Sequence, residues 1–207
     1  AFQTIVARVG EHGELGAGEL FYLLGANQYD AATAQEPLQL VGFDRTENKG
    51  VVWEYTERTG LVAVPVPASI YGDVLAMRSA RSALVLAPGM DSALSLWAMA
   101  NLRRENSLGD QKDPSYPGSA PVASFFARLV GPDRLNDVLG RALADQDAEL
   151  ALDAIVALRE VAQAQILANA APLIDALTYP DRRVRYMAAF ALAAARPNET
   201  FGGSYRV

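Results

Sequence analysis

Residues 142–150 read ALADQDAEL, and 34 residues later residues 176–184 read ALTYPDRRV. The register continues past these stretches, because three apolar residues recur at the same offset: Ala154 as Ala188, Ala157 as Ala191, and Leu158 as Leu192. A fixed period of this length is typical of stacked helical pairs that bury their apolar faces against one another. The repeat therefore predicts a mainly α-helical protein with an α-solenoid in its C-terminal part.

The helix signals divide this region into two helical pairs. We expect the first pair over 132–144 and 148–161, and the second over about 170–178 and 182–195. Asp147 and Asp181 stand directly before the second helix of each pair, where a carboxylate can accept a backbone N–H of the first turn. The period assigns one set of residues to the core of the second pair: Val184, Ala188, Ala191 and Leu192.

The N-terminal half has a different pattern. A helix is expected over 16–32, with one apolar face formed by Leu20, Leu23, Leu24 and Tyr29. Residues 38–66 predict a β-hairpin, because β-branched and aromatic residues alternate around a turn at 48–50. Two strands are not stable alone in water, so the hairpin must lie against helices. A helical pair follows over about 70–105.

Proline and glycine concentrate between the two halves. Residues 107–121 contain three prolines and two glycines, a composition that favours a linker or a long surface loop. The predicted organisation is an N-terminal helical region over 1–106, a linker over 107–121, and helical repeats over 122–207. Because both ends interrupt a pattern, we expect the chain to be a fragment of a longer protein.

Composition restricts the classes of function. The chain has no cysteine and one histidine, His12, so we predict no metal site, no cofactor and no thiol chemistry. The net charge of −6 argues against general nucleic-acid binding, which needs clustered positive charge. No apolar run is long enough to span a membrane. We expect a soluble protein, with a cytoplasmic and an exported location both left open.

Two stretches carry a family resemblance. Residues 172–192, PLIDALTYPDRRVRYMAAFAL, resemble a HEAT repeat of the short bacterial kind, and the resemblance covers about 131–195. A fainter similarity to a tetratricopeptide helical pair covers about 70–105, with Ala76, Ala80 and Ala83 at the small-residue positions. The order of these parts is similar to that of large bacterial HEAT-repeat proteins of unknown function.

The resemblance implies an armadillo-like fold and a polar ladder between neighbouring repeats. Asp147, Asp181 and Arg185 would belong to this ladder. Ala151 stands where Arg185 stands in the second repeat, so the ladder is not expected to be continuous. The resemblance also implies a scaffold that binds a protein partner, and not an enzyme, with no catalytic residues.

Two alternative functions remain open at this point. Short bacterial HEAT repeats also occur in phycobilin lyase-type proteins, which would need a groove for an extended chromophore. The chain could instead be a structural spacer within a longer solenoid. We expect a monomer, or a weak end-to-end dimer of the truncated chain.

The candidate partner-binding residues lie near the starts of the second helices: Glu149, Asp153, Arg182, Arg183 and Tyr186. Carboxylates here are interpreted as helix caps and not as a catalytic pair, which would need an apolar pocket. Arg182, Arg183 and Arg185 could grip an acidic group, although solvation of the first two and a ladder role for the third are the simpler interpretation. Trp53 and Tyr55 could anchor a partner if exposed, and we expect them to be buried against the helices.

Overall fold

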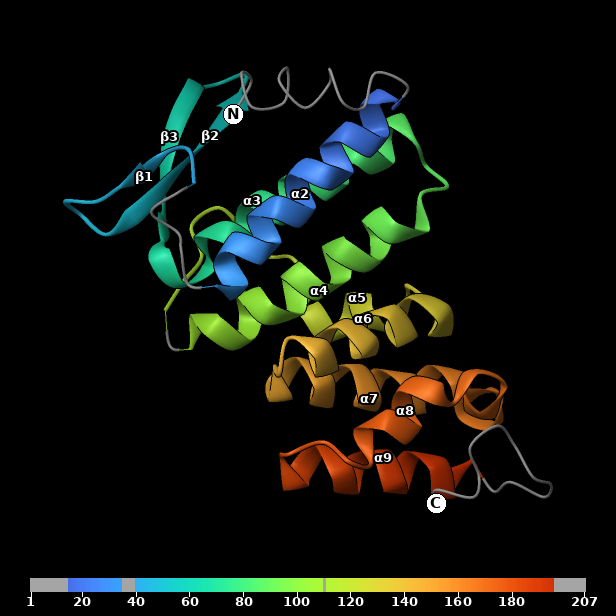
Figure 1. The fold of residues 1–207 in the computed structure, drawn as a ribbon. Coiled ribbons are helices and arrows are strands. Elements are labelled where there is room, and N and C mark those ends of the chain that lie inside the picture. The colour runs from blue at the N-terminus through green and yellow to red at the C-terminus, as the bar shows by residue number, and fades with distance from the viewer. Residues whose placement is uncertain (1–14, 35–39, 110, 196–207) are drawn as a thin grey trace. The chain divides into compact units, whose positions relative to one another are not determined.

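The computed structural model describes residues 15–34, 40–109 and 111–195. By its contacts the chain divides into two compact units, Ala1–Ala120 and Pro121–Val207, which are described separately. Within the described residues the protein is mainly helical, with one small antiparallel sheet in the first unit (Figure 1). None of the described helices is both long and apolar enough to cross a membrane.

Among its described residues the first unit has, besides the sheet, the helices α2 (Ala17–Thr33), α3 (Ala68–Leu86) and α4 (Asp91–Leu108). Helix α3 packs against both of the others. The expected leucine face of α2 is wrong in part, because Leu23 is 37% exposed. Tyr29 of the predicted face is buried, and the other buried positions of α2 are Gly18 and Gly25.

Glycines allow α2 and α3 to approach closely. A Cβ on Gly72 of α3 would lie 2.5 Å from the Cβ of Ala32 on α2, and a Cβ on Gly25 would lie 3.1 Å from the Cβ of Ser79. A larger residue at either position would push the helices apart. The helix pair is therefore held by close backbone packing. Small residues make this contact, so a pattern of large apolar residues does not predict it.

The sheet has three strands, not the two predicted. Strands β1 (Phe43–Asp44), β2 (Lys49–Thr56) and β3 (Gly60–Pro67) form it in the order β1-β2-β3. The β1–β2 turn spans 45–48, so it begins three residues before the predicted turn at 48–50. Its backbone is shaped by Asp44, whose Oδ1 accepts the N–H groups of Thr46 and Glu47. Residues 38 and 39 of the predicted hairpin lie outside the described residues.

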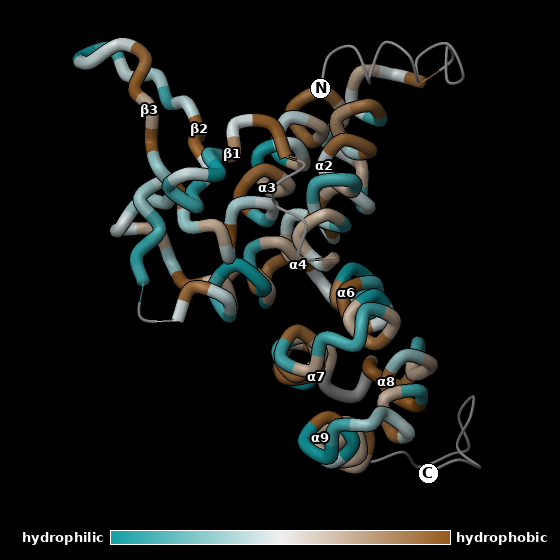
Figure 2. The backbone as a smooth tube through the Cα atoms, turned by 60° about the vertical axis from the view of Figure 1, so that its left-hand side comes forward, coloured by the Kyte–Doolittle hydropathy of each residue, from teal (hydrophilic) through white to brown (hydrophobic). Residues whose placement is uncertain are grey.

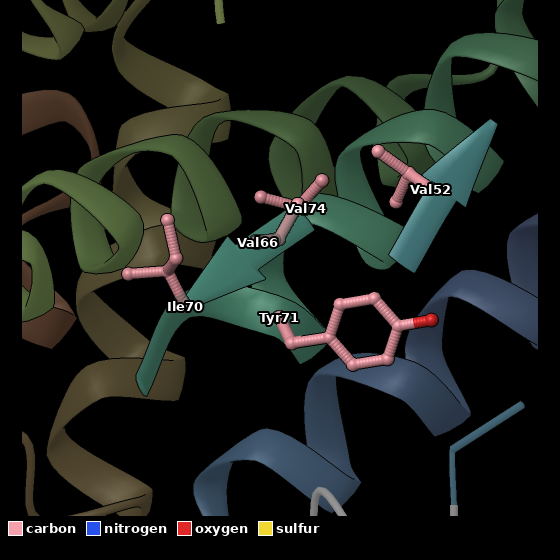
Figure 3. Close-up of a cluster of buried hydrophobic side chains, with 5 residues drawn as sticks. All are labelled: Val52, Val66, Ile70, Tyr71 and Val74. Carbon is pink, nitrogen blue, oxygen red and sulfur yellow. The ribbon is translucent and has the colours of Figure 1, made fainter. Parts of the chain in front are cut away.

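The sheet packs against the start of α3, as expected for strands that cannot stand alone. Val52 and Val66 from the strands meet Ile70, Tyr71 and Val74 from the helix (Figure 3). The Tyr71 hydroxyl donates to the carbonyl oxygens of residue 41, at 2.6 Å, and residue 51, at 3.2 Å. Burial raises the pKa of this hydroxyl, so it keeps the proton that it donates.

A buried ion pair joins the three helices of the first unit. Arg103 of α4 lies 2.6 Å from the Asp73 carboxylate of α3, and both side chains are almost fully buried. The same guanidinium donates to the backbone oxygen of Tyr29 and to the Thr33 hydroxyl on α2, and it lies 3.5 Å from the centre of the Tyr29 ring. The carboxylate partner is 30 residues away in the sequence, so no local pattern of residues indicates this pair.

The region predicted as a linker begins with an ordered, packed segment. Helix α4 continues to Leu108, and Asp113 then forms a buried ion pair with Arg104 at 3.1 Å. Tyr116 lies 4.0 Å from the same guanidinium, and Ser115 donates to Asp113. Within 111–116 the chain is therefore anchored on α4.

The second unit contains helices α5 (Ala123–Ala127), α6 (Pro132–Ala144), α7 (Ala148–Ala162), α8 (Ala171–Ala176) and α9 (Arg182–Ala194), with a 3-10 segment at Gln163–Asn169. The predicted bounds of α6, α7 and α9 agree with these within two residues. Helices α7 and α9 start 34 residues apart, whereas α8 is much shorter than α6. The period is thus kept by the second helices and not by the first.

The predicted core register of the second unit is confirmed. Val184, Ala188, Ala191 and Leu192 are all buried, and so are the residues 34 positions earlier, which include Ala154 and Leu158. Helix α6 contacts α7 and α8, and α9 contacts α7 and α8. The repeat in the sequence therefore corresponds to apolar positions that pack between these helices.

Candidate partner-binding face

Two aspartates shape the starts of α7 and α9. Asp147 Oδ1 accepts the backbone N–H of Leu150 at 3.0 Å, and Asp181 Oδ1 accepts that of Arg183 at 2.7 Å. Each aspartate stands one residue before its helix, so both satisfy donors of the first helical turn. These positions recur at the 34-residue offset, and each aspartate caps the helix that follows it, through the third residue of α7 and the second residue of α9.

Arg185 does not pair with Asp181, contrary to the ladder that the resemblance implied. Its Nη1 donates to the carbonyl oxygens of Tyr179, at 2.8 Å, and Pro180, at 2.6 Å. Both carbonyls belong to the turn that precedes α9. Arg185 therefore fastens the turn that precedes its own helix.

Arg183 makes the polar link between α7 and α9. Its Nη2 lies 2.7 Å from Glu149 Oε1 on α7 and 2.9 Å from Asp181 Oδ2. The hydrogen bond from this guanidinium lowers the pKa of Asp181 below its usual value. Arg183 is exposed yet engaged with two carboxylates, so the expectation of simple solvation is wrong for this residue. Asp153, the other predicted acidic residue, is half-buried on α7 one turn after Glu149.

Two exposed aromatic rings follow along α9. Tyr186 is 60% exposed and Phe190 is 57% exposed. The Arg182 guanidinium lies 4.8 Å from the centre of the Tyr186 ring, and the Arg159 guanidinium of α7 lies 5.0 Å from that of Phe190. Such distances are within the range of cation–π attraction. Each ring is thus paired with an arginine, one from the same helix and one from α7.

We call this surface the α7–α9 face, and it consists of Glu149, Asp153, Arg159, Arg182, Arg183, Tyr186 and Phe190. Printed contacts aside from sequence position join Glu149 to Arg183 and Arg182 to Tyr186, whereas Asp153 is included because it lies on α7 one turn after Glu149. Phe190 and Arg159 are additional members that the sequence analysis missed. The spacing of four between residues 182, 186 and 190 was the available signal for Phe190, since it places them along one stripe opposite the buried positions. Figure 2 shows hydrophilic and hydrophobic stretches on both α7 and α9.

The second surface of interest is the outer face of the β2–β3 ribbon. The expected burial of Trp53 and Tyr55 is wrong, because these side chains are 56% and 73% exposed. Trp53 pairs with Ala63 and Tyr55 with Leu61 across the strands, so they share the face opposite Val52. Helix α3 covers the Val52 face, which leaves the aromatic face open.

A hollow of about 440 Å³ lies in the first unit beside the start of α3, and its lining includes Lys49, Pro65, Ser69 and Gln111. Lys49 is also near Glu47, at 3.8 Å. Among the described residues no group of three or more His, Cys, Asp or Glu side chains could hold a metal ion. The hollow therefore offers one lysine, the hydroxyl group of Ser69 and the side-chain amides of Asn48 and Gln111, and three of its nine lining residues are prolines.

Comparison with known proteins found no matching family model, no matching curated protein and no matching solved structure. Function is therefore inferred from the surface chemistry of the described residues.

Proposed function

We propose that the chain is a non-catalytic helical-repeat scaffold of the HEAT type, which binds a protein partner through the α7–α9 face. The observation that carries the proposal is the pairing of two exposed aromatic rings with two arginines on adjacent helices. Aromatic and arginine side chains supply most of the binding energy in many protein interfaces. Their clustering on one surface supports a binding role.

The arrangement of α7 and α9 supports a repeat architecture. Glu149 near the start of α7 reaches Arg183 near the start of α9, and Arg159 near the end of α7 reaches Phe190 near the end of α9. The two helices thus run in the same direction. Stacked helical repeats place equivalent helices side by side in this way, so a solenoid built on the 34-residue period is the architecture that we propose.

The chemistry of the face favours binding over catalysis. Arginine keeps its proton at neutral pH and cannot act as a general acid or base there. The carboxylate of Glu149 is exposed and paired with Arg183, so it does not lie in the apolar pocket in which a catalytic carboxyl group acts. These groups can hold a partner in place and exclude water from it.

The proposal is tested by partner capture with matched variants. The wild-type chain is used to isolate binding proteins, and each is then titrated against the Tyr186→Ala/Phe190→Ala double variant and against Val85→Ala. Val85 is 73% exposed on α3 and serves as the control for loss of an exposed apolar side chain. We expect the double variant to weaken binding at least tenfold while the control leaves it unchanged.

Two results would contradict the proposal. Equal binding by wild type and the double variant would place the interaction elsewhere and leave the α7–α9 face without a binding role. Covalent attachment of an extended chromophore to or by the protein would instead favour the lyase alternative. Circular dichroism of each variant checks that the helices are retained, so that a loss of binding reports on the face itself.

A further inference from the structure

The α7–α9 face carries positive charge that internal carboxylates do not neutralise. Helix α9 has three arginines and no acidic residue. Arg183 is engaged with Glu149 and Asp181, and Arg185 with two backbone carbonyls. Within the part of the chain that the structure describes, Arg182 and Arg159 have aromatic partners but no carboxylate within ion-pair distance.

The aromatic rings hold these two guanidiniums in place. Arg182 is stacked with Tyr186, while Arg159 is stacked with Phe190 and also donates to the Met187 sulfur at 3.9 Å. A guanidinium that lies over a ring keeps N–H groups along its edge, and this edge can donate two parallel hydrogen bonds to one carboxylate. Because stacking limits side-chain motion beforehand, less conformational entropy is lost when an anion binds.

The two stacks are close enough for one short segment to reach both. Tyr186 and Phe190 are four residues apart on α9, a rise of about 6 Å along the helix axis. An extended chain advances roughly 3.3 Å per residue, so two acidic residues within about five positions of each other can reach both guanidiniums. The exposed rings then contact the apolar side chains between them.

Resting on the function proposed above, we infer that the α7–α9 face selects an acidic protein segment, with one carboxylate on Arg159 and one on Arg182. The positive charges of these two guanidiniums are complementary to the negative charges of such a segment. A nucleic acid fits less well, because it carries a negative charge at every nucleotide, whereas a protein segment can place one carboxylate on each arginine and apolar side chains between them. The net charge of −6 also opposes the approach of a polyanion.

Fluorescence anisotropy with two labelled peptides tests the inference. The first is a decapeptide in which Glu and Leu alternate, and the second has Gln in place of every Glu. We expect the wild-type chain to bind the Glu peptide at least tenfold tighter than the Gln peptide, with affinity falling as salt is added, because the contacts are ionic.

Substitutions of the two arginines test whether the peptide binds at the α7–α9 face. The Arg159→Gln/Arg182→Gln double variant should bind the Glu peptide at least tenfold more weakly than the wild-type chain does. Its affinity for the Gln peptide should be unchanged. Arg182→Lys keeps the charge but loses the planar fork, so it should retain only part of the affinity. Arg81→Gln is the matched control, since it removes one positive charge from an exposed position on α3.

The outcomes distinguish this inference from the function on which it rests. Any one of four results would overturn the acidic-segment inference. Two concern the Glu peptide itself, namely an affinity equal to that of the Gln peptide or no binding up to about 1 mM. The others are a loss of Glu-peptide affinity in Arg81→Gln as large as in the double variant, and tighter binding of a single-stranded oligonucleotide. If captured partners still depended on Tyr186 and Phe190 in any of these cases, the proposed function would stand with a different partner chemistry.

Discussion

Gly50 is the position at which one added methyl group should have the largest effect in the first unit. A Cβ at this residue would lie 1.9 Å from Cδ2 of Tyr71 and 2.2 Å from two further ring atoms. The ring is almost fully buried, and its hydroxyl donates to the backbone carbonyls of residues 41 and 51. Gly50→Ala therefore forces the ring or the strand to move.

The size of the effect follows from what the ring loses. Overpacking a well-filled core costs about 1–3 kcal/mol, and the loss of a buried hydroxyl's hydrogen bond costs about 1 kcal/mol. We expect Gly50→Ala to lower the free energy of unfolding of the first unit by about 2–4 kcal/mol. Gly89→Ala is the control, because no atom lies within 4 Å of its added Cβ, and it should change stability by no more than about 0.5 kcal/mol.

Guanidinium unfolding followed by tryptophan fluorescence measures this change. Both tryptophans, Trp53 and Trp97, belong to the first unit, so their signal reports its unfolding. In a Tyr71→Ala background the ring that the added Cβ would meet is absent. Gly50→Ala should then lower the free energy of unfolding much less than it does in the wild-type background. A double-mutant cycle measures this difference as a coupling energy. An unchanged unfolding midpoint for Gly50→Ala, or additive effects in the cycle, would refute the close approach of strand and ring.

Three further predictions concern other parts of the molecule. Leu192→Asp places a charge at a position only 1% exposed and should unfold the second unit, visible as a loss of helical circular dichroism; an unaltered spectrum and melting temperature would show that Leu192 is not in a core. Asp73→Ala leaves the buried Arg103 without its carboxylate and should destabilise the first unit by about 3–5 kcal/mol in the fluorescence assay, whereas a change below about 1 kcal/mol would mean that the pair is solvated. The pKa of Asp181 is lowered in the folded state by Arg183, so its contribution to stability is present above its ordinary pKa of about 4 and is lost as pH falls. The stability difference between wild type and Asp181→Asn should therefore shrink on acidification below pH 4, and a difference that grows would contradict the sign.

The sequence predicted the second unit well because its signals are local and repeated. The helix starts at residues 148 and 182 were marked by an aspartate directly before an apolar periodic segment, and Leu158 and Leu192 lie in the core as the period required. Helical periodicity specifies which face of a helix is apolar, so burial follows wherever that face meets a neighbour. The predicted binding residues of α9, Arg182 and Tyr186, are both exposed for the same reason, since they lie opposite its buried positions.

The first unit was predicted less well because its contacts are distant in sequence or involve small residues. The packing of Gly25 and Gly72 gives no hydrophobic signal, and the partner of Arg103 comes from another helix. Trp53 and Tyr55 alternate correctly for strand residues, but alternation does not say which face of a ribbon a helix will cover. Only the packing of α3 on Val52 and Val66 decides this, and it leaves the aromatic residues exposed.

The sequence by itself determined the helical class, the 34-residue register and the residues that it buries, because these follow from periodicity within short windows. Tertiary structure alone decided which charges meet: it joined Arg183 to Glu149, turned Arg185 toward the carbonyls of its own turn, and brought Arg159 to Phe190. The physical reason is that side-chain pairing depends on the relative placement of whole helices, which no local pattern of residues specifies. The proposed binding face is built from these pairings on a framework that the repeat predicts.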